Sequence, residues 1–178
     1  MDKMLGTTGR EKFPDYEQSR RSVLDRLIKE NNLEFGAELG VQSGYLFFHL
    51  LDTHPNLILF GVDAWIGNDR AAYAKMKEEA NEKVADYKNG MIMNMTTNQA
   101  AEKTPDASLD FVFIDADHSY PACKKDMQKW LPKVKVGGYI IGHDYKVKPV
   151  KRAIEEVFGE KGYKTDVDQV WYVKKEKA

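Results

Sequence analysis

The sequence predicts an α/β protein built around a doubly wound, mostly parallel sheet. First, segments with the composition of strands alternate along the chain with segments of helical spacing. Second, residues 111–114 and 139–141 are apolar throughout, as expected for strands that helices cover on both faces. Third, no helix separates the last two predicted strands, so they must pair antiparallel as a C-terminal hairpin.

The predicted elements follow one another in a regular order. Strands are expected at 35–39, 57–62, 91–95, 109–115, 138–142, 163–167 and 170–173. Helices are expected at 15–32, 43–52, 70–87, 99–103, 119–131 and 150–159. Asp168 and Gln169 form the tight turn between the last two strands.

Composition indicates one soluble domain with an ordinary core. Hydrophobic residues make up 42% and charged residues 31% of the 178 residues, and the formal net charge is -1. Because no bulk charge attracts polyanions or anionic lipid, we expect neither a nucleic-acid nor a membrane partner. The single cysteine, Cys123, excludes an intrachain disulfide and is expected to be a packed thiol in a helix. The polar residues 1–13 contain no signal-like apolar stretch, so a cytoplasmic location is expected.

Two acidic residues follow neighbouring apolar runs. Asp115 ends the first run, and Asp144 comes shortly after the second. Ligands of an open parallel sheet bind outside the carboxyl ends of its strands, so we expect both carboxylates at the functional edge. His118 follows Asp115 by three residues, at the start of the next helix. This pattern predicts a site with two oxygen ligands suited to Mg²⁺ and one base that titrates near neutral pH.

Several residues near this edge have alternative interpretations. Asp115 could cap the following helix or contact a cofactor without metal, and His118 could bond to local backbone. Strand alternation predicts that His143 points to the opposite face from Asp144 and is structural. Trp65 and Tyr145 lie just past strand ends and could line a ligand pocket, although core packing is equally consistent for Trp65.

A glycine turn follows the first predicted strand, in the segment AELGVQSG. Gly40 permits the tight turn, and Gly44 lets the next helix approach the sheet. Backbone N–H groups of residues 41–43 then face a ligand at the helix N-terminus. Asp63 ends the second strand about 20 residues later, at the spacing of an acid that holds ribose hydroxyls.

The turn departs from a dinucleotide-binding pattern. Gln42 stands where that pattern has its middle glycine, and the carboxylate of Glu38 opens the turn. A carboxylate would repel a pyrophosphate but suits a cationic ligand. S-adenosylmethionine carries a sulfonium and an amino group and has no phosphate.

With these residues, the chain resembles the class I S-adenosylmethionine-dependent methyltransferases, and most closely the small O-methyltransferases related to macrocin and rhamnosyl O-methyltransferases. The resemblance covers residues 35–173 and rests on the motifs ELGVQSG, GVDAW, LDFVFIDADHSY and GGYIIGHDY. It implies a Rossmann-like sheet within a single methyltransferase domain over 1–178. Residues 1–32 would form an N-terminal arm and helix, and residues 33–178 the cofactor-binding core.

The resemblance also implies roles for individual residues. Glu38 and Gly40 would cradle the methionine part of S-adenosylmethionine, and Asp63 would bind its ribose. Thr96 and Thr97, in the turn after the third strand, would contact the adenine.

Metal-dependent relatives bind Mg²⁺ through acids that match Asp115 and Asp144, and a histidine that matches His118 acts as the base. Catechol-type relatives have an asparagine directly after the second acid, where this chain has Tyr145. The sequence identifies no third protein ligand, and water could complete the coordination sphere of Mg²⁺.

The expected activity is therefore O-methylation of a small-molecule hydroxyl, such as that of a sugar. A homodimer through the aromatic residues of the final hairpin is a further expectation. Two alternatives stay open. A nicotinamide-dependent oxidoreductase is disfavoured by Gln42 and by the terminal hairpin, and a cofactor-binding module without catalysis is the other.

Overall fold

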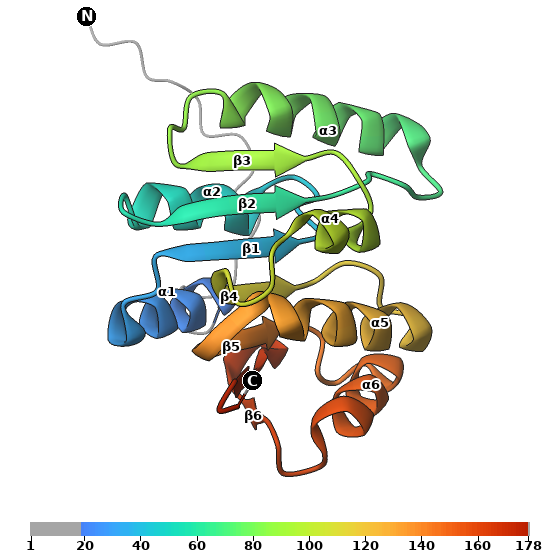
Figure 1. Cartoon of the computed structure of the whole chain (residues 1–178). Coiled ribbons are helices and arrows are strands. Elements are labelled where there is room, and N and C mark those ends of the chain that lie inside the picture. Colours follow the sequence, from blue (N-terminus) through green and yellow to red (C-terminus); the bar gives the residue numbers. More distant parts are fainter. Residues whose placement is uncertain (1–18, 178) are drawn as a thin grey trace, which may run out of the picture.

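The computed structural model describes residues 19–177 and confirms the predicted α/β architecture. Seven strands form one sheet in the order β3-β2-β1-β4-β5-β7-β6 (Figure 1). The strands are β1 (Phe35–Leu39), β2 (Ile58–Val62), β3 (Gly90–Met93), β4 (Leu109–Ile114), β5 (Val134–Gly142), β6 (Lys164–Thr165) and β7 (Trp171–Lys174). The helices are α1 (Arg20–Asn31), α2 (Tyr45–Thr53), α3 (Arg70–Val84), α4 (Thr97–Lys103), α5 (Tyr120–Trp130) and α6 (Lys148–Phe158). The predicted N-terminal arm and the first residues of the predicted first helix lie outside the described residues.

The sheet is parallel from β3 to β5, and its direction reverses only at β7. β1 pairs in parallel with both β2 and β4, and β4 pairs in parallel with β5. β7 runs antiparallel to β5 and to β6, which confirms the predicted C-terminal hairpin. β6 is shorter than predicted because the short 3-10 helix η3 (Val167–Gln169) occupies most of the connection.

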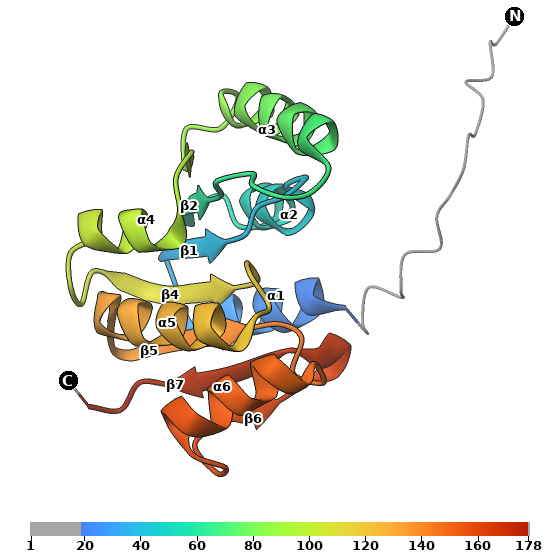
Figure 2. The ribbon, with the colours of Figure 1, turned by 90° about the vertical axis from the view of Figure 1, so that its right-hand side faces the viewer.

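Helices cover the sheet on both faces. α1, α2 and α3 pack on one face, and α4, α5 and α6 pack on the other (Figure 2). Successive residues of β4 serve the two layers in turn: Phe111 and Phe113 face the first layer, and Val112 and Ile114 face the second. This double coverage is the physical reason for the continuous apolar run in the sequence.

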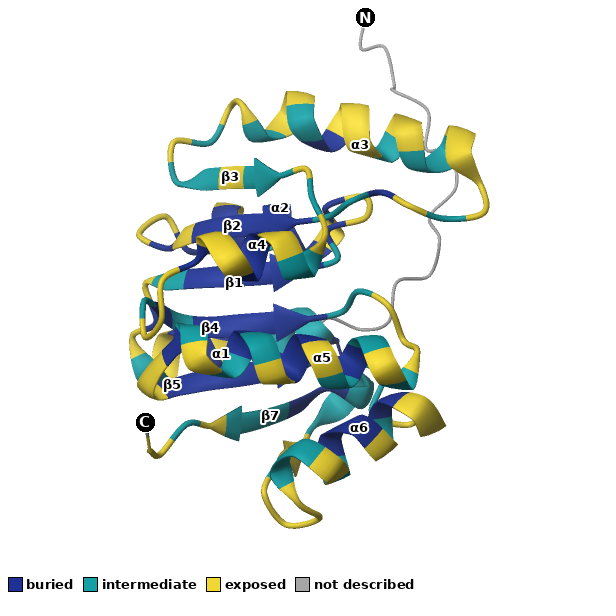
Figure 3. Ribbon diagram, turned by 45° about the vertical axis from the view of Figure 1, so that its right-hand side comes forward, coloured by how far each residue is buried: buried dark blue, intermediate teal, exposed yellow. Residues whose placement is uncertain are grey.

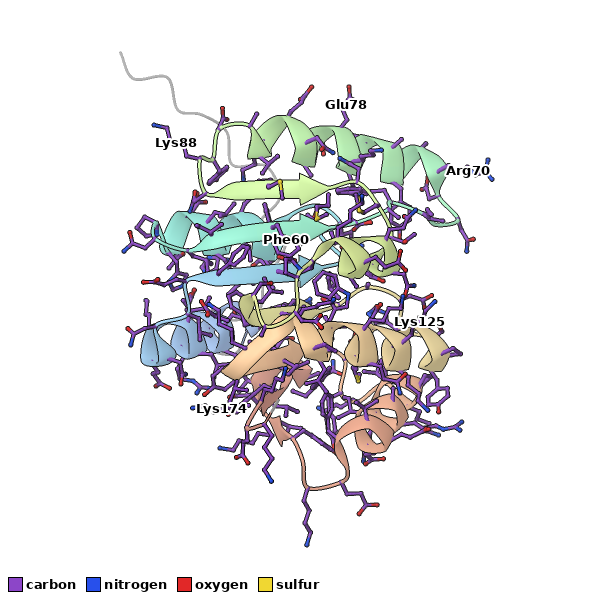
Figure 4. All side chains as sticks on the ribbon, in the orientation of Figure 1. Phe60, Arg70, Glu78, Lys88, Lys125 and Lys174 are labelled. Carbon is purple, nitrogen blue, oxygen red and sulfur yellow. The ribbon has the colours of Figure 1, made fainter. Side chains whose placement is uncertain are left out.

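Burial is greatest in the central strands, and among the α-helices it is least in α3 (Figure 3). Charged side chains surround this core; Figure 4 shows Glu78, Lys88 and Lys125 at the periphery and Phe60 over the sheet. Within residues 19–177, no helix is long and apolar enough to cross a bilayer.

The centre of the sheet is the point where the strand order reverses. From β1 the chain goes to β2 on one side, and from β4 it goes to β5 on the other. The turn after β1 therefore passes close to the end of β4. Gly40 has a φ of +92°, and a Cβ on it would lie 2.1 Å from the carbonyl oxygen of Asp115. Only glycine fits this close approach, which leaves a crevice open above the two strands.

The start of α4 corrects one predicted boundary. The helix begins at Thr97 and not at Gln99 as predicted, because Thr96 and Gln99 form a capping box. The Gln99 N–H donates to the Thr96 hydroxyl oxygen at 3.3 Å, and the Thr96 N–H donates to the Gln99 side-chain oxygen at 3.0 Å. The exchange satisfies two backbone donors at the helix N-terminus and fixes the threonine turn at the sheet edge.

A buried carboxylate joins α1 to α2. The Asp25 side chain is 3% exposed, and its two oxygens contact different imidazoles. His49 Nε2 lies 2.9 Å from one oxygen, and His54 Nε2 lies 2.6 Å from the other. The sequence suggested no role for His49 or His54, because Asp25, the partner of both, is distant along the chain.

We expect Asp25→Ala to lower the free energy of unfolding by about 2–4 kcal/mol, because it removes the acceptor that both imidazoles share in the interior. Urea unfolding followed by circular dichroism measures the change. Glu30→Ala, on an exposed part of the same helix, is the control and should cost less than about 1 kcal/mol. Equal losses in the two variants would contradict a structural role for the buried cluster.

Candidate active site

A cavity of about 950 Å³ opens at the carboxyl ends of β1, β2 and β4. It brings together eight of the predicted site residues: Glu38, Gly40, Asp63, Thr96, Thr97, Asp115, His118 and Asp144. Gly44 lies behind the turn and does not line the cavity; a Cβ on it would lie 2.3 Å from the Phe48 ring. Its smallness leaves room for the Phe48 ring of the same helix, and the predicted approach of α2 to the sheet stays a prediction.

Glu38 lies at the floor of this cavity, near the end of β1. Its side chain is almost fully buried, and Oε2 has no hydrogen-bond partner among the described residues. Burial, together with the charge of Asp115, raises the pKa of the Glu38 carboxyl well above its usual range. An unpaired buried carboxylate of this kind is costly and would be stabilised by a cationic ligand.

Asp63 fixes the loop that follows β2. Its Oδ2 accepts the Gln42 N–H at 2.9 Å, and its Oδ1 accepts the Trp65 N–H at 2.6 Å. Each carboxylate oxygen can accept a second hydrogen bond, so the ribose contact stays a prediction. The same network holds the Trp65 indole, whose Nε1 donates to the Gln42 carbonyl.

Thr97 connects the cavity to a buried acid on α5. Its hydroxyl donates to Asp126 Oδ1 at 2.6 Å, and the Asp126 side chain also lines the cavity. Burial raises the pKa of Asp126 to about 6. The sequence gave no signal for this acid, since it lies on a helix face whose burial depends on α4.

The two predicted strand-end acids meet at His118. His118 Nε2 lies 3.2 Å from Asp115 Oδ1 and 2.9 Å from Asp144 Oδ2. The hydrogen bond that His118 donates to Asp115, together with the charge of Asp144, raises the pKa of His118. One ligand atom from each residue lies within 4.8 Å of the others, which confirms the predicted proximity. Two carboxylates and an imidazole form a donor set that a hard divalent cation such as Mg²⁺ accepts.

The prediction for His143 is wrong. His143 Nδ1 lies 3.3 Å from Asp144 Oδ1 and 3.9 Å from Asp115 Oδ1, so the imidazole belongs to the same cluster. β5 ends at Gly142, and Asp144 has a φ of +60°. Alternation of faces holds only within a strand, and the backbone has already turned at these residues.

Two further residues of the cluster come from segments distant in sequence. Arg20 Nη1 lies 2.5 Å from Asp115 Oδ2, and Asp168 Oδ1 lies 3.6 Å from His143 Nε2. The sequence placed Asp168 only in a turn and gave Arg20 no role. Asp168 has a φ of +51°, an unfavourable conformation that its surroundings must support.

The structure settles three other predicted positions. Trp65 packs in the core and Tyr145 packs against Tyr163, so neither lines the cavity. Cys123 is buried, as predicted, and burial raises the pKa of its thiol to about 12.

This strand order, the glycine turn and the strand-end acids are typical of α/β proteins that bind a cofactor at the carboxyl edge of the sheet. The chain belongs to the methyltransferase domain family, whose model matches residues 37–145, more than half of its length. The family implies S-adenosylmethionine as the methyl donor.

A curated relative and two solved structures are also similar. The protein y4gI of Sinorhizobium fredii, itself described as uncharacterized, is 26% identical over 120 residues, which cover 62% of this chain and 13% of y4gI. A caffeoyl-CoA O-methyltransferase structure from Staphylococcus aureus has a TM-score of 0.67 at 20% identity, covering 85% of this chain and 80% of its own. An O-methyltransferase structure from Klebsiella pneumoniae has a TM-score of 0.69 at 18% identity, covering 94% and 84%. At these identities the structures establish the shared fold.

We expect Asp126→Asn to stabilise the protein at pH 7. The raised pKa means that the folded state resists ionisation of Asp126, at a cost of up to about 3 kcal/mol above pH 6. This cost disappears as the pH falls from 6 towards the unfolded-state pKa of about 4, so the gain should shrink over that range. The Asn oxygen can still accept the Thr97 hydroxyl.

Urea unfolding of both proteins at pH 7, 5.5 and 4 measures this difference. A stability gain that does not change with pH would show that removal of the Asp126 charge is not its cause.

Proposed function

We propose that this protein is an S-adenosylmethionine-dependent O-methyltransferase that acts on the hydroxyl group of a small molecule, such as a sugar, with assistance from Mg²⁺. The observation that carries the proposal is the buried carboxyl group of Glu38, which lines the cavity near the glycine turn and whose Oε2 has no hydrogen-bond partner among the described residues. A cofactor with an ammonium and a sulfonium group would supply the missing positive charge. The Glu38 carboxylate would repel the negative charge of a pyrophosphate.

The remaining cofactor contacts follow from the cavity walls. The methionine part would lie on Glu38 and Gly40. Because Gly40 has no side chain, its backbone would contact the cofactor directly. The ribose would face Asp63 at the end of β2, and the adenine would lie towards Thr96 and Thr97 at the start of α4. These groups would bind and orient the donor.

When bound, the cofactor supplies an electrophilic methyl group, and a divalent ion lowers the pKa of an acceptor hydroxyl that binds to it. Asp115 and Asp144 offer hard carboxylate oxygens that lie within 4.8 Å of each other, so they are compatible with the ion and leave His118 free to act as the base. Tyr145, in place of the asparagine of catechol-type relatives, turns away from the cavity towards Tyr163. Water would then complete the coordination sphere.

His118 is the proposed general base. The bound cofactor would supply the methyl group and leave as a neutral thioether, and His118 would take the proton of the acceptor hydroxyl. The carboxylates raise the pKa of His118, which favours its protonated form. Positive charge bound at Asp115 and Asp144 would offset this effect and favour the neutral imidazole that a base requires.

The mouth of the cavity is suited to a small organic acceptor. Tyr45, Ile66 and Tyr73 are among the residues that line the cavity, and Ile66 is 79% exposed. Exposed apolar side chains at a cavity mouth are typical of a binding surface. These aromatic and apolar side chains, together with the acid cluster, support an acceptor that has a ring face and at least one hydroxyl group.

Calorimetric titration with S-adenosylhomocysteine tests the cofactor assignment. We expect micromolar binding to the wild type and a loss of about tenfold or more in Glu38→Gln, which removes the buried negative charge. Glu34→Gln is the matched control, because Glu34 is exposed at the opposite end of β1. Absence of binding to the wild type would refute the proposal, and equal affinity in both variants would remove Glu38 from it.

Asp144→Ala tests the role of the acid cluster in catalysis. We expect methyl transfer to fall by about 100-fold or more, because the variant loses a ligand and a partner of the base, whereas S-adenosylhomocysteine affinity stays within about threefold. Release of S-adenosylhomocysteine with a panel of hydroxyl acceptors is the readout. Full activity of the wild type after treatment with EDTA would rule out the Mg²⁺ requirement.

A further inference from the structure

Arg20 already places a positive charge on the proposed ion site. It is the first residue of α1, and its Nη1 lies 2.5 Å from Asp115 Oδ2. Asp115 is one of the two carboxylates proposed to hold the divalent ion. The side chains of Arg20 and Asp115 are 31% and 15% exposed, so solvent screens their charges only in part. A guanidinium at this oxygen repels a divalent cation that approaches it.

A second carboxylate outside the ion site is within reach of Arg20. The Arg20 backbone N–H donates to Asp168 Oδ2 at 2.9 Å, and Nε of the side chain lies 3.4 Å from the same oxygen. Asp168 belongs to the connection between β6 and β7 and faces His143 with its other oxygen. The guanidinium therefore bridges one carboxylate that belongs to the proposed ion site and one that does not.

The backbone around this bridge is held in place. Asp168 and Gln169 adopt positive φ angles of 51° and 58°, which are unfavourable outside glycine and need support from their surroundings. Arg26, on the same helix, pairs with Asp166 in the same connection. Two arginine–aspartate pairs thus fasten α1 to the β6–β7 connection, and only the guanidinium of Arg20 needs to move for Asp115 to become free.

We propose that Arg20 is a positioning residue that competes with the divalent ion for Asp115, and that Asp168 receives its guanidinium when the ion binds. This inference rests on the proposed function, because it requires an ion at Asp115 and Asp144. It makes the ion affinity weaker than the two carboxylates alone would give.

Calorimetric titration of the full chain with Mg²⁺, and with Mn²⁺ followed by electron paramagnetic resonance, tests the competition. Arg20→Met should bind both ions about tenfold tighter than the wild type, because the competing charge is gone. Arg26→Met is the matched control, since it removes the other α1–aspartate pair without touching the cluster, and its ion affinity should stay within about twofold of wild type. Arg20→Gln is a second variant should Arg20→Met fold poorly by circular dichroism.

Asp168→Asn distinguishes a receiving carboxylate from an ion ligand. In the wild-type background it should weaken ion binding by about threefold or more, because the displaced guanidinium loses its second partner. In the Arg20→Met background it should have no effect. Weakening in both backgrounds would identify Asp168 as a ligand and overturn its proposed role.

The remaining outcomes separate this inference from the proposed function. Equal ion affinity in the wild type and in Arg20→Met would overturn the competition and leave the ion site intact. If neither protein binds an ion while both bind S-adenosylhomocysteine, the Mg²⁺ part of the proposed function fails, and the competition fails with it. The methyl-donor assignment would then stand on its own.

Discussion

The close approach of the turn after β1 to the end of β4 is the constraint on which the rest of the site depends. Gly40 lies against the carbonyl group of Asp115, and no other residue fits there without shifting one of the two strands. The contact holds the end of β1 beside the end of β4. It therefore fixes Glu38, on the first strand, within the same cavity as Asp115, on the second. The β1–β4 pairing and this close contact together position Glu38 and Asp115.

The excess of negative charge at this edge is the second organising feature. Four acidic residues converge here from four segments: Glu38, Asp115, Asp144 and Asp168. Among the described residues, Arg20 is the one arginine that lines the cavity. Such a cluster is unfavourable in the absence of cations. The arrangement is consistent with a site that binds a cationic donor at one end and a divalent ion at the other, with an internal arginine that balances part of the charge.

The local sequence pattern was sufficient to predict the sheet and most of the cavity. Continuous apolar runs located the parallel strands, and the absence of a helix before the last strand predicted the reversal at β7. Eight predicted site residues line the cavity because strand ends in a parallel sheet share one edge. The same logic failed for His143, since a bend after Gly142 ends the alternation that it assumed.

By itself, the sequence determined the fold class, the glycine turn and the acids at the strand ends, because these depend on residue type and spacing along one segment. Only the tertiary structure decided that Arg20 pairs with Asp115, that Asp168 closes the cluster, and that Asp25 joins two helices. These pairs link residues from segments far apart in the chain. Their meeting depends on how helices and the final hairpin pack against the sheet, and charge spacing in a sequence carries no record of that packing.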